Sequence, residues 1–462
     1  MNPTPECGRG PLIVIAPGAL THEQTAREIT ERALRARGLA GEPVFPASAD
    51  EMHRLIRSAG AATGSGAHTE AAPAATAETG ANTTAGAKPG TDAGTRAEVE
   101  AATGAAVEQD ANAVAMVAIV VPGPEGAPPH WGAGVIRVDF GPCPPDPSPE
   151  VVAHIRGRGL DGLRFAVESW YHRRFHPAAT HAYGDHPEQR AELRMPEGDG
   201  PFPVAVLVHG GYWRSRWAAD LMDAAATDLT ARGHATWNIE YRRPDEHGWA
   251  ATTADVATAL SAVATIPEVR RLDLERVVVL GHSAGAQLAL RAAADAATDP
   301  RAGAAPAPGP ALTAAPHPGS PAVAPTPTPA PARARAAARV RPALAVALAG
   351  VLDLPLGDRR WLSEGAVSSA LGGRHDALPD VYAAASPTHR LPLGVPQLVV
   401  CCTGDDPDLL EMSRAHAARA SATADHVTVI EGPGDHFDVI DPATPVWRRI
   451  CASITLPPAP AR

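Results

Sequence analysis

The stretch Arg276-Val-Val-Val-Leu-Gly-His-Ser-Ala-Gly-Ala-Gln-Leu-Ala-Leu290 decides the fold, because it joins a strand, a sharp turn and a helix. Its apolar start predicts a buried strand, and Ala286–Ala296 predicts the helix. Between them, Gly281-His-Ser-Ala-Gly285 fits G-x-S-x-G, the turn that lifts a serine above an α/β sheet. Side chains in place of the two glycines would collide with the following helix. Ser283 is therefore the candidate nucleophile.

Similar short apolar runs lie on both sides of this unit, and helical segments separate most of them. The strand candidates are Val204–Val208, Thr236–Ile239, Val277–Leu280, Ala343–Ala347, Gln397–Cys401 and Val427–Ile430. The helix candidates include Trp217–Arg232, Thr253–Thr265 and Glu411–Ala420. This alternation is typical of a doubly wound, mostly parallel α/β sheet with helices on both faces. We expect one domain over residues 165–455, with an unfolded Pro/Ala-rich insertion at residues 299–339.

Two loops after later strands offer the partners that a serine nucleophile needs. A base must take the serine proton, and an acid must orient the base. In this architecture the chain order is Ser, then Asp or Glu, then His. His436 leaves the strand Val427–Ile430, and Asp405 leaves Gln397–Cys401, with Asp406 as the alternative acid. His282 is a weaker candidate base, because its side chain leaves the turn in another direction from Ser283.

The segment His209-Gly-Gly-Tyr-Trp213 follows the strand Val204–Val208 and is the candidate oxyanion loop. Gly210 and Gly211 allow the backbone to turn its N–H groups inward. We expect the N–H groups of Gly211 or Tyr212, with that of Ala284, to stabilise the oxyanion of a tetrahedral intermediate.

Three side chains of this loop have structural alternatives. We expect His209 to be a hydrogen-bonding residue rather than a catalyst. Tyr212 and Trp213 are candidates for lining a pocket for an aromatic substrate, and core packing is the alternative. The segment Glu240–Arg243 is expected to form structural ion pairs rather than to bind substrate.

The N-terminal part of the chain predicts a smaller, flavodoxin-like α/β domain over residues 1–142. Its strand candidates are Pro11–Ile15, Val44–Phe45, Val114–Val121 and Val135–Phe140, and its helix candidates are Thr21–Arg37 and Ala49–Ser58. An Ala/Gly/Thr-rich tract at residues 59–112 has too little large apolar surface to fold. The Pro-rich stretch after residue 142 predicts a linker over residues 143–164.

The composition and residue spacing of the chain argue against several classes of protein. The 51 acidic and 40 basic residues give a net charge of −11, which argues against a dedicated nucleic-acid binder. No run approaches the ~18 apolar residues of a membrane span, and the N-terminus is a poor signal peptide. The five cysteines lack metal-like spacing. His172 and His176 stand four apart, as on one face of a helix, but Pro177 follows directly and no H-E-x-x-H motif is present. We expect a cytoplasmic protein with reduced cysteines, no metal and no cofactor.

Taken in order, these motifs resemble the α/β-hydrolase superfamily, and within it the arylformamidase (kynurenine formamidase) and HGG-type esterase/lipase branch. The matching segments are His209–Trp213, Gly281–Gly285, Tyr183–Gln189, Trp237–Arg242 and Ala349–Asp353. The resemblance implies a Ser283–His436–Asp405 triad that hydrolyses an ester or an N-formyl amide. Cys401-Cys402 departs from the His-Gly that such proteins often carry before the acid turn.

The N-terminal block is weakly similar to type II dehydroquinases, on Leu12–Gly18, Val44–Glu51 and Ile119–Gly123. Those enzymes use a tyrosine on a mobile loop, and this chain has no tyrosine before Tyr171. We therefore expect a degenerate domain that serves oligomerisation or covers the active site, and a dehydratase-type lyase is the least favoured function.

The leading hypothesis is a serine hydrolase acting on a small-molecule ester or amide. The alternative is a non-catalytic, two-domain binding or scaffold protein. The sequence leaves a homo-oligomer open.

Overall fold

The computed structural model of the 462-residue chain describes residues 8–20, 22–64, 116–124, 130–131, 134–146, 148–298 and 340–454. It divides into two compact units, of which the first comprises Met1–Ile155 and Gly159–Trp170. The second comprises Arg156–Arg158 and Tyr171–Arg462. The Pro/Ala-rich insertion at 299–339 and residues 65–112 of the other expected insertion lie outside the described residues.

The second unit is built on an eight-stranded sheet in the order β15-β14-β13-β12-β10-β11-β9-β8. Its strands are β8 (Ala179–Ala182), β9 (Arg190–Arg194), β10 (Phe202–Val208), β11 (Ala235–Ile239), β12 (Leu272–His282), β13 (Leu344–Leu348), β14 (Gln397–Cys402) and β15 (Val427–Gly432). From β11 to β15 all neighbours are parallel, whereas β9 is antiparallel to both β11 and β8. The expected doubly wound, mostly parallel sheet is confirmed.

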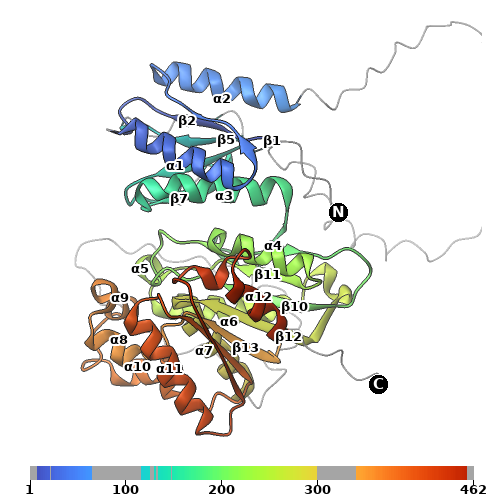
Figure 1. Cartoon of the computed structure of the whole chain (residues 1–462), viewed down its shortest axis with the longest axis vertical. Helices are drawn as coiled ribbons and strands as arrows, with labels where there is room; N and C mark the ends of the chain where they lie inside the picture. Colours follow the sequence, from blue (N-terminus) through green and yellow to red (C-terminus); the bar gives the residue numbers. More distant parts are fainter. Residues whose placement is uncertain are drawn as a thin grey trace, which may run out of the picture. The chain divides into compact units, whose positions relative to one another are not determined.

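Helices cover both faces of this sheet (Figure 1). The α-helices are α4 (Asp223–Ala231), α5 (Pro244–His247), α6 (Trp249–Ala262), α7 (Ala284–Thr298), α8 (Leu354–Arg359), α9 (Leu362–Leu371), α10 (Pro379–Ala385), α11 (Pro407–Ser421) and α12 (Pro445–Ser453). The 3₁₀ turns are η2 (Ala219–Met222), η3 (Pro267–Arg271), η4 (Pro387–His389) and η5 (Asp438–Ile440). On one face, α4 and α12 pack on the sheet together with η2 and η5, whereas α6, α7 and α11 pack on the other.

Alternate residues of each central strand enter these two cores. On β10, Val206 and Val208 join the core with α6 and α7, and Ala205 and Leu207 join the core with α4 and α12. Successive side chains of a strand point to opposite faces, so a strand buried on both sides must be apolar throughout. This is why continuous apolar runs, rather than alternating ones, predict these strands correctly.

The first unit contains a five-stranded sheet in the order β4-β2-β5-β6-β7. Its strands are β2 (Leu12–Ile15), β4 (Pro43–Val44), β5 (Met116–Val121), β6 (Gly134–Asp139) and β7 (Val151–Arg156), and β1 (Gly8–Arg9) pairs separately with β3 (Leu39–Ala40). The helices are α1 (Glu23–Ala36), α2 (Ala49–Gly64), η1 (Gly159–Asp161) and α3 (Gly162–Phe175), whose end belongs to the second unit. The strand order is that of flavodoxin-like sheets. The similarity to dehydroquinases stays a prediction.

Two expectations for this part of the chain are wrong. Residues 143–164 were expected to be a linker, but they include β7, the edge strand of the five-stranded sheet. This strand carries His154 and Arg156 and is mostly half-buried, so its apolar signal is weak. Helix α2 continues to Gly64, so the first six residues of the tract expected to be unfolded are helical.

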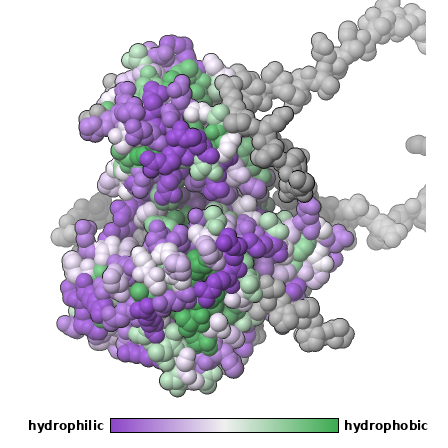
Figure 2. All heavy atoms as spheres, viewed as in Figure 1, coloured by the Kyte–Doolittle hydropathy of each residue, from purple (hydrophilic) through white to green (hydrophobic). Residues whose placement is uncertain are grey.

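In the part of the chain that the structure describes, no helix is long and apolar enough to cross a membrane. The face of the molecule in Figure 2 is mostly hydrophilic, and hydrophobic side chains occur there in small patches. Among the large hydrophobic residues, Phe175, Trp361, Val429 and Phe437 are the exposed ones in the described residues.

Candidate active site

Ser283 occupies the turn between β12 and α7. Its φ of 55° lies in the left-handed region, which a residue with a side chain adopts at a cost in energy. The turn is tight, because a Cβ added at Gly281 would lie 2.1 Å from the carbonyl oxygen of Gly285. A Cβ added at Gly285 would lie 2.2 Å from that of Val208. The N–H of Ser283 donates to the carbonyl oxygen of Leu348 at 2.8 Å, which fixes the turn against β13.

The loop after β10 lies against this turn. A Cβ added at Gly210 would lie 2.9 Å from the Cβ of Ser283 and 2.6 Å from the carbonyl oxygen of His282. The backbone at Gly210 therefore touches the candidate nucleophile directly, and only glycine leaves room for the contact. The sequence predicts a backbone turn at Gly210, whereas the structure shows that close approach is what requires this glycine.

The left-handed turn in the loop comes one residue later. Gly211, Tyr212 and Trp213 have φ values of 106°, 51° and 57°. Two successive left-handed residues with side chains indicate stored backbone strain, which in proteins concentrates at functional sites. No described residue accepts a hydrogen bond from the N–H of Gly211 or Tyr212. The N–H of Ala284 opens helix α7 and has no acceptor within the helix.

Asp405 and His436 meet at the ends of β14 and β15. The Nδ1 of His436 lies 2.9 Å from Oδ1 and 3.1 Å from Oδ2 of Asp405, whose side chain is almost fully buried. Asp406 points elsewhere, because its carboxylate caps α11 by accepting from the N–H of Asp408 at 2.8 Å. The contact with the imidazole thus belongs to Asp405 and not to its neighbour.

Backbone hydrogen bonds tie these two loops together. The N–H of Thr403 donates to the carbonyl oxygen of Gly432 at 2.9 Å, and that of Gly404 donates to Gly434 at 2.9 Å. Cys401-Cys402, where the sequence departs from the resembling proteins, is buried in β14. The departure lies in the strand, so it does not disturb the loop that carries the acid. The four cysteines that the structure describes are free thiols.

His282 lies against His436. The two ring centroids are 4.7 Å apart, and Nε2 of His282 donates to the carbonyl oxygen of His436 at 3.0 Å. Burial lowers the pKa of His282 to about 3, and the nearby His436 acts in the same direction. The His282 ring therefore stays neutral, and its hydrogen bond to the backbone carbonyl positions the loop of His436. Among the described contacts, no hydrogen bond joins the side chains of Ser283 and His436.

His209 belongs to a buried ionic network below the glycine loop. Its Nδ1 lies 2.9 Å from the carbonyl oxygen of Gly210, and its Nε2 lies 3.1 Å from the carboxylate of Glu240. Glu240 also binds the guanidinium of Arg243. Burial alone would raise the pKa of Glu240, but Arg243 and His209 hold it well below its usual range. Tyr241 stacks on the His209 ring at 4.3 Å.

The aromatic residues expected to line a pocket divide into two kinds. Trp213 is 1% exposed, donates from Nε1 to Gln287 at 3.2 Å and packs edge-on against Trp249, so core packing describes it. Tyr212 is half-buried, and burial together with the carboxylates of the acid loop raises its pKa to about 12. Phe437, which no sequence motif indicates as a site residue, is 42% exposed and lies edge-on against His436 at 5.5 Å.

His172 and His176, the histidine pair considered as a metal site from sequence, lie on helix α3. His172 contacts Thr227 at 3.1 Å, and its ring lies 5.9 Å from that of His176. Two other groups of side chains bring three potential ligand atoms together. They are Asp139, Cys143 and His154, and His186, Glu188 and His247.

The family-model match with known proteins lies in the second unit. Residues 192–304 match the family model described as BD-FAE. The chain is 31% identical over 132 residues to Esterase LipC of Mycobacterium tuberculosis (strain ATCC 25618 / H37Rv). That alignment covers 28% of this chain and 32% of the relative, so the chain spans about a third of the length of the curated relative.

Solved structures of esterases are also similar to this chain. Esterase B from Lactobacillus rhamnosis is 17% identical, covers 60% of this chain and 85% of its own, and has a TM-score of 0.46. A truncated carbohydrate esterase from gut microbiota is 15% identical, with coverages of 60% and 95% and a TM-score of 0.47. Est2 from Thermogutta terrifontis, bound to butyrate, is 16% identical, with coverages of 60% and 91% and a TM-score of 0.43.

Proposed function

We propose that the protein is a serine carboxylesterase, because it has an α/β-hydrolase domain and its residues 192–304 match the BD-FAE family model. One observation carries the proposal. A strained serine at the end of β12 contacts a glycine loop, its neighbour His282 binds the loop of His436, and His436 is hydrogen-bonded to a buried carboxylate. These are the parts that activation of a serine requires. The similarity to Esterase LipC supports the same class of reaction.

In this proposal Ser283 attacks the acyl carbon while His436 takes the hydroxyl proton. Asp405 holds the proton on Nδ1, so that Nε2 of His436 is free to act as base, and it stabilises the imidazolium that forms. The same proton passes to the leaving alcohol or amine as the acyl-enzyme forms. Water then gives a proton to His436 and attacks the acyl-enzyme, which releases the acid and restores Ser283. The Ser283–His436 hydrogen bond forms when substrate binds, since such contacts are often long in the free enzyme.

The developing oxyanion is stabilised by backbone donors. The N–H groups of Gly211 or Tyr212 and of Ala284 lie beside the serine and are not used by the described backbone. Gly210 presses the loop against Ser283, and the His209–Glu240–Arg243 network supports it from below. Donors fixed before the reaction need no reorganisation as charge develops.

The substrate class that we propose is a small carboxylic ester or an N-formyl amide. Phe437 offers exposed aromatic surface next to His436, and half-buried Tyr212 lies near the carboxylates of the acid loop, so a substrate would contact both. The resemblance of the HGG loop and elbow to arylformamidases supports the N-formyl amide. N-formylkynurenine, short-chain and long-chain esters and simple amides, assayed side by side, separate these possibilities by kcat/KM.

The test is Ser283→Ala, with Ser453→Ala on the exposed face of α12 as the matched control. We expect Ser283→Ala to lower the turnover of p-nitrophenyl acetate by about 10⁶-fold and to abolish labelling by a fluorophosphonate. Ser453→Ala should behave like the wild type in both assays. Labelling that persists in Ser283→Ala would refute the nucleophile. A folded wild type that neither labels nor hydrolyses any ester would instead favour a binding or scaffold protein.

A further inference from the structure

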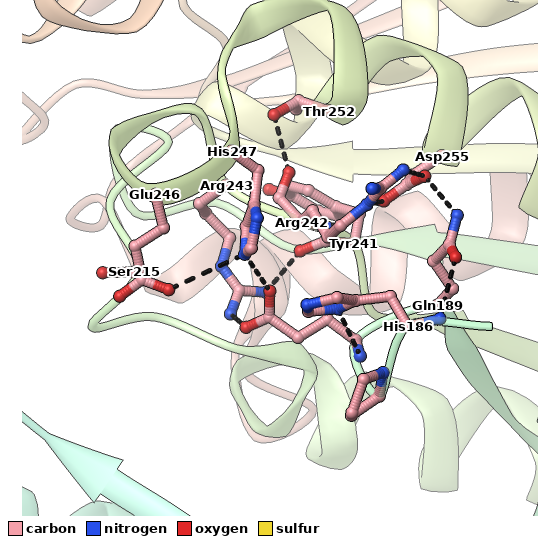
Figure 3. Close-up of polar contacts among 12 residues, drawn as sticks. His186, Gln189, Ser215, Tyr241, Arg242, Arg243, Glu246, His247, Thr252 and Asp255 are labelled. Atoms are coloured by element: carbon pink, nitrogen blue, oxygen red, sulfur yellow. Dashed lines mark hydrogen bonds and ion pairs between the residues drawn. The ribbon is translucent and has the colours of Figure 1, made fainter. Parts of the chain in front are cut away.

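His186, Glu188 and His247 bring three ligand-type side chains together away from Ser283. His186 and Glu188 lie in the loop between β8 and β9, and His247 ends α5. One ligand atom from each residue lies within 4.8 Å of the others. The two imidazole rings meet edge to face with centroids 4.7 Å apart, and His247 points toward the loop that carries His186 (Figure 3).

The carboxylate of Glu188 is held with one oxygen toward the imidazoles. Its Oε1 binds the guanidinium of Arg243. Its Oε2 is buried, has no hydrogen-bond partner among the described residues, and lies 3.4 Å from Nε2 of His247. The charge of Arg243 is shared with buried Glu240, so the guanidinium does not cancel the negative charge of this group.

The loop of His186 is fixed before any ligand arrives. The N–H of His186 donates to Oε1 of Gln189 at 3.1 Å, and Nε2 of Gln189 donates to Asp255 at 2.7 Å. Asp255 is in turn clamped by Arg242 (Figure 3). A buried carboxylate therefore anchors the loop, and little freedom is left to lose when an ion binds.

We propose that His186, Glu188 and His247 bind a divalent transition-metal ion of the Zn²⁺ class. Two imidazole nitrogens and one carboxylate oxygen form a ligand set that such ions take in proteins, with water in the remaining position. His247 is exposed, which leaves the site open to solvent. Arg243 remains on Oε1 and orients the ligand carboxylate, as outer partners of metal ligands do.

The ligand atom of His186 follows from its hydrogen bonds. In the free protein its Nδ1 accepts from the N–H of Glu188 at 3.2 Å, which leaves the ring proton on Nε2. An ion at Nε2 therefore moves that proton to Nδ1, and this one long hydrogen bond is exchanged for one from Nδ1 to water at the surface.

The other group of three, Asp139, Cys143 and His154, is less suited to an ion. Asp139 is already engaged by His154 at 2.7 Å and by Arg137 at 2.6 Å. An ion would have to compete with Arg137, whose guanidinium binds both oxygens of this carboxylate. The Glu188 group offers a carboxylate oxygen without a hydrogen bond, and we therefore place the site there.

The test uses the full-length protein after dialysis against a chelator. Co²⁺ is titrated as a spectroscopic probe through its visible d–d absorption, and Zn²⁺ is then added in competition. We expect one tightly bound equivalent in the wild type. His247→Ala and His186→Ala should each weaken that equivalent at least about 100-fold, because losing a direct ligand costs at least as much as losing an outer partner. His375→Ala, at another solvent-facing histidine, should leave it unchanged.

His247→Ala is the decisive variant, because His247 is exposed and its loss leaves the core intact. Circular dichroism and thermal melting check that each variant is folded. Binding that is unchanged in His247→Ala, or no tight equivalent in the wild type, would overturn the proposal. Ser283→Ala should bind Co²⁺ like the wild type, so the esterase proposal and the metal site succeed or fail separately.

Discussion

At the scale of single residues, Gly210 sets the distance between the glycine loop and the nucleophile. A methyl group at this position would lie within 2.9 Å of both Ser283 and the His282 backbone, so the loop would have to retreat. We expect Gly210→Ala to lower kcat/KM for p-nitrophenyl acetate by about 100-fold, the effect of misplacing catalytic groups by roughly 1 Å. Gly141→Ala is the control, because a Cβ there meets nothing within 4 Å. A Gly210→Ala protein as active as the wild type would contradict the proposed contact.

Asp405 and Asp406 are sequence neighbours with different roles, because Asp405 binds His436 and Asp406 caps α11. The same substitution at each position distinguishes the two roles. Asp405→Asn should lower kcat by about 10⁴-fold, because the amide favours the wrong tautomer of His436. Asp406→Asn should retain near-wild-type kcat, since asparagine caps α11 about as well as aspartate. Steady-state kinetics and urea unfolding of both variants are the measurements. Equal losses of activity in the two would show that the acid is not assigned correctly.

The residues of the candidate site could be proposed from sequence because each motif follows a strand and the chain order is fixed. Their supporting contacts could not be predicted. His282 binds the backbone of His436, which is 154 positions away, and Glu240 reaches His209 from the end of the neighbouring strand. Such contacts depend on side-chain directions that only the folded backbone defines. Gly210 shows the same limit, since the motif indicates a glycine but not what it touches.

At the scale of elements, strand β9 shows what the apolar pattern misses. Its sequence Arg190-Ala-Glu-Leu-Arg194 has charges at alternate positions, yet Glu192 and Arg194 are buried. Arg173 and Asp223 neutralise them through ion pairs at 2.8 and 3.0 Å. A charged strand becomes part of the core only when its partners come from distant segments. The apolar pattern therefore predicts the parallel strands but not the antiparallel strands β8 and β9 at the edge of the sheet.

His416 links helix α11 to strand β14 and gives the protein a pH-dependent stability. Its ring contacts Thr388 at 3.0 Å and Gln397 at 2.8 Å, and burial lowers its pKa from 6.5 to about 4. The unfolded chain binds a proton below pH 6.5 that the folded chain refuses until about pH 4. Stability is thus complete above pH 6.5 and falls as the pH drops toward 4, by about 3 kcal/mol from this residue.

Urea unfolding from pH 4 to 7 measures this effect. His416→Gln should show a shallower loss of unfolding free energy on acidification than the wild type, whatever its stability at pH 7. Buried His282 contributes to the same window in both proteins, so the comparison isolates His416. The same change at partly exposed His375 should leave the slope as in the wild type. Identical slopes in His416→Gln and wild type would disprove the assignment.

At the scale of the whole molecule, the chain divides into two compact units, and each has a buried core. Ile56 lies in the core of the five-stranded sheet, and Leu229 lies in the core of the esterase-like sheet, both without exposed surface. Truncating either side chain to alanine removes packed atoms and leaves a cavity, at a cost of about 2–5 kcal/mol. The free energy of unfolding is lowered for the unit that contains the cavity.

We therefore expect scanning calorimetry of the full chain to resolve two transitions. Ile56→Ala should lower the temperature of one of them and leave the temperature at which ester hydrolysis is lost unchanged. Leu229→Ala should lower the other transition together with the inactivation temperature. Residual activity after heating reports on the hydrolase unit even where unfolding is irreversible, because it needs no equilibrium. If Ile56→Ala inactivates the enzyme at as low a temperature as Leu229→Ala, the two units unfold as one, and the first unit is required to keep the site assembled.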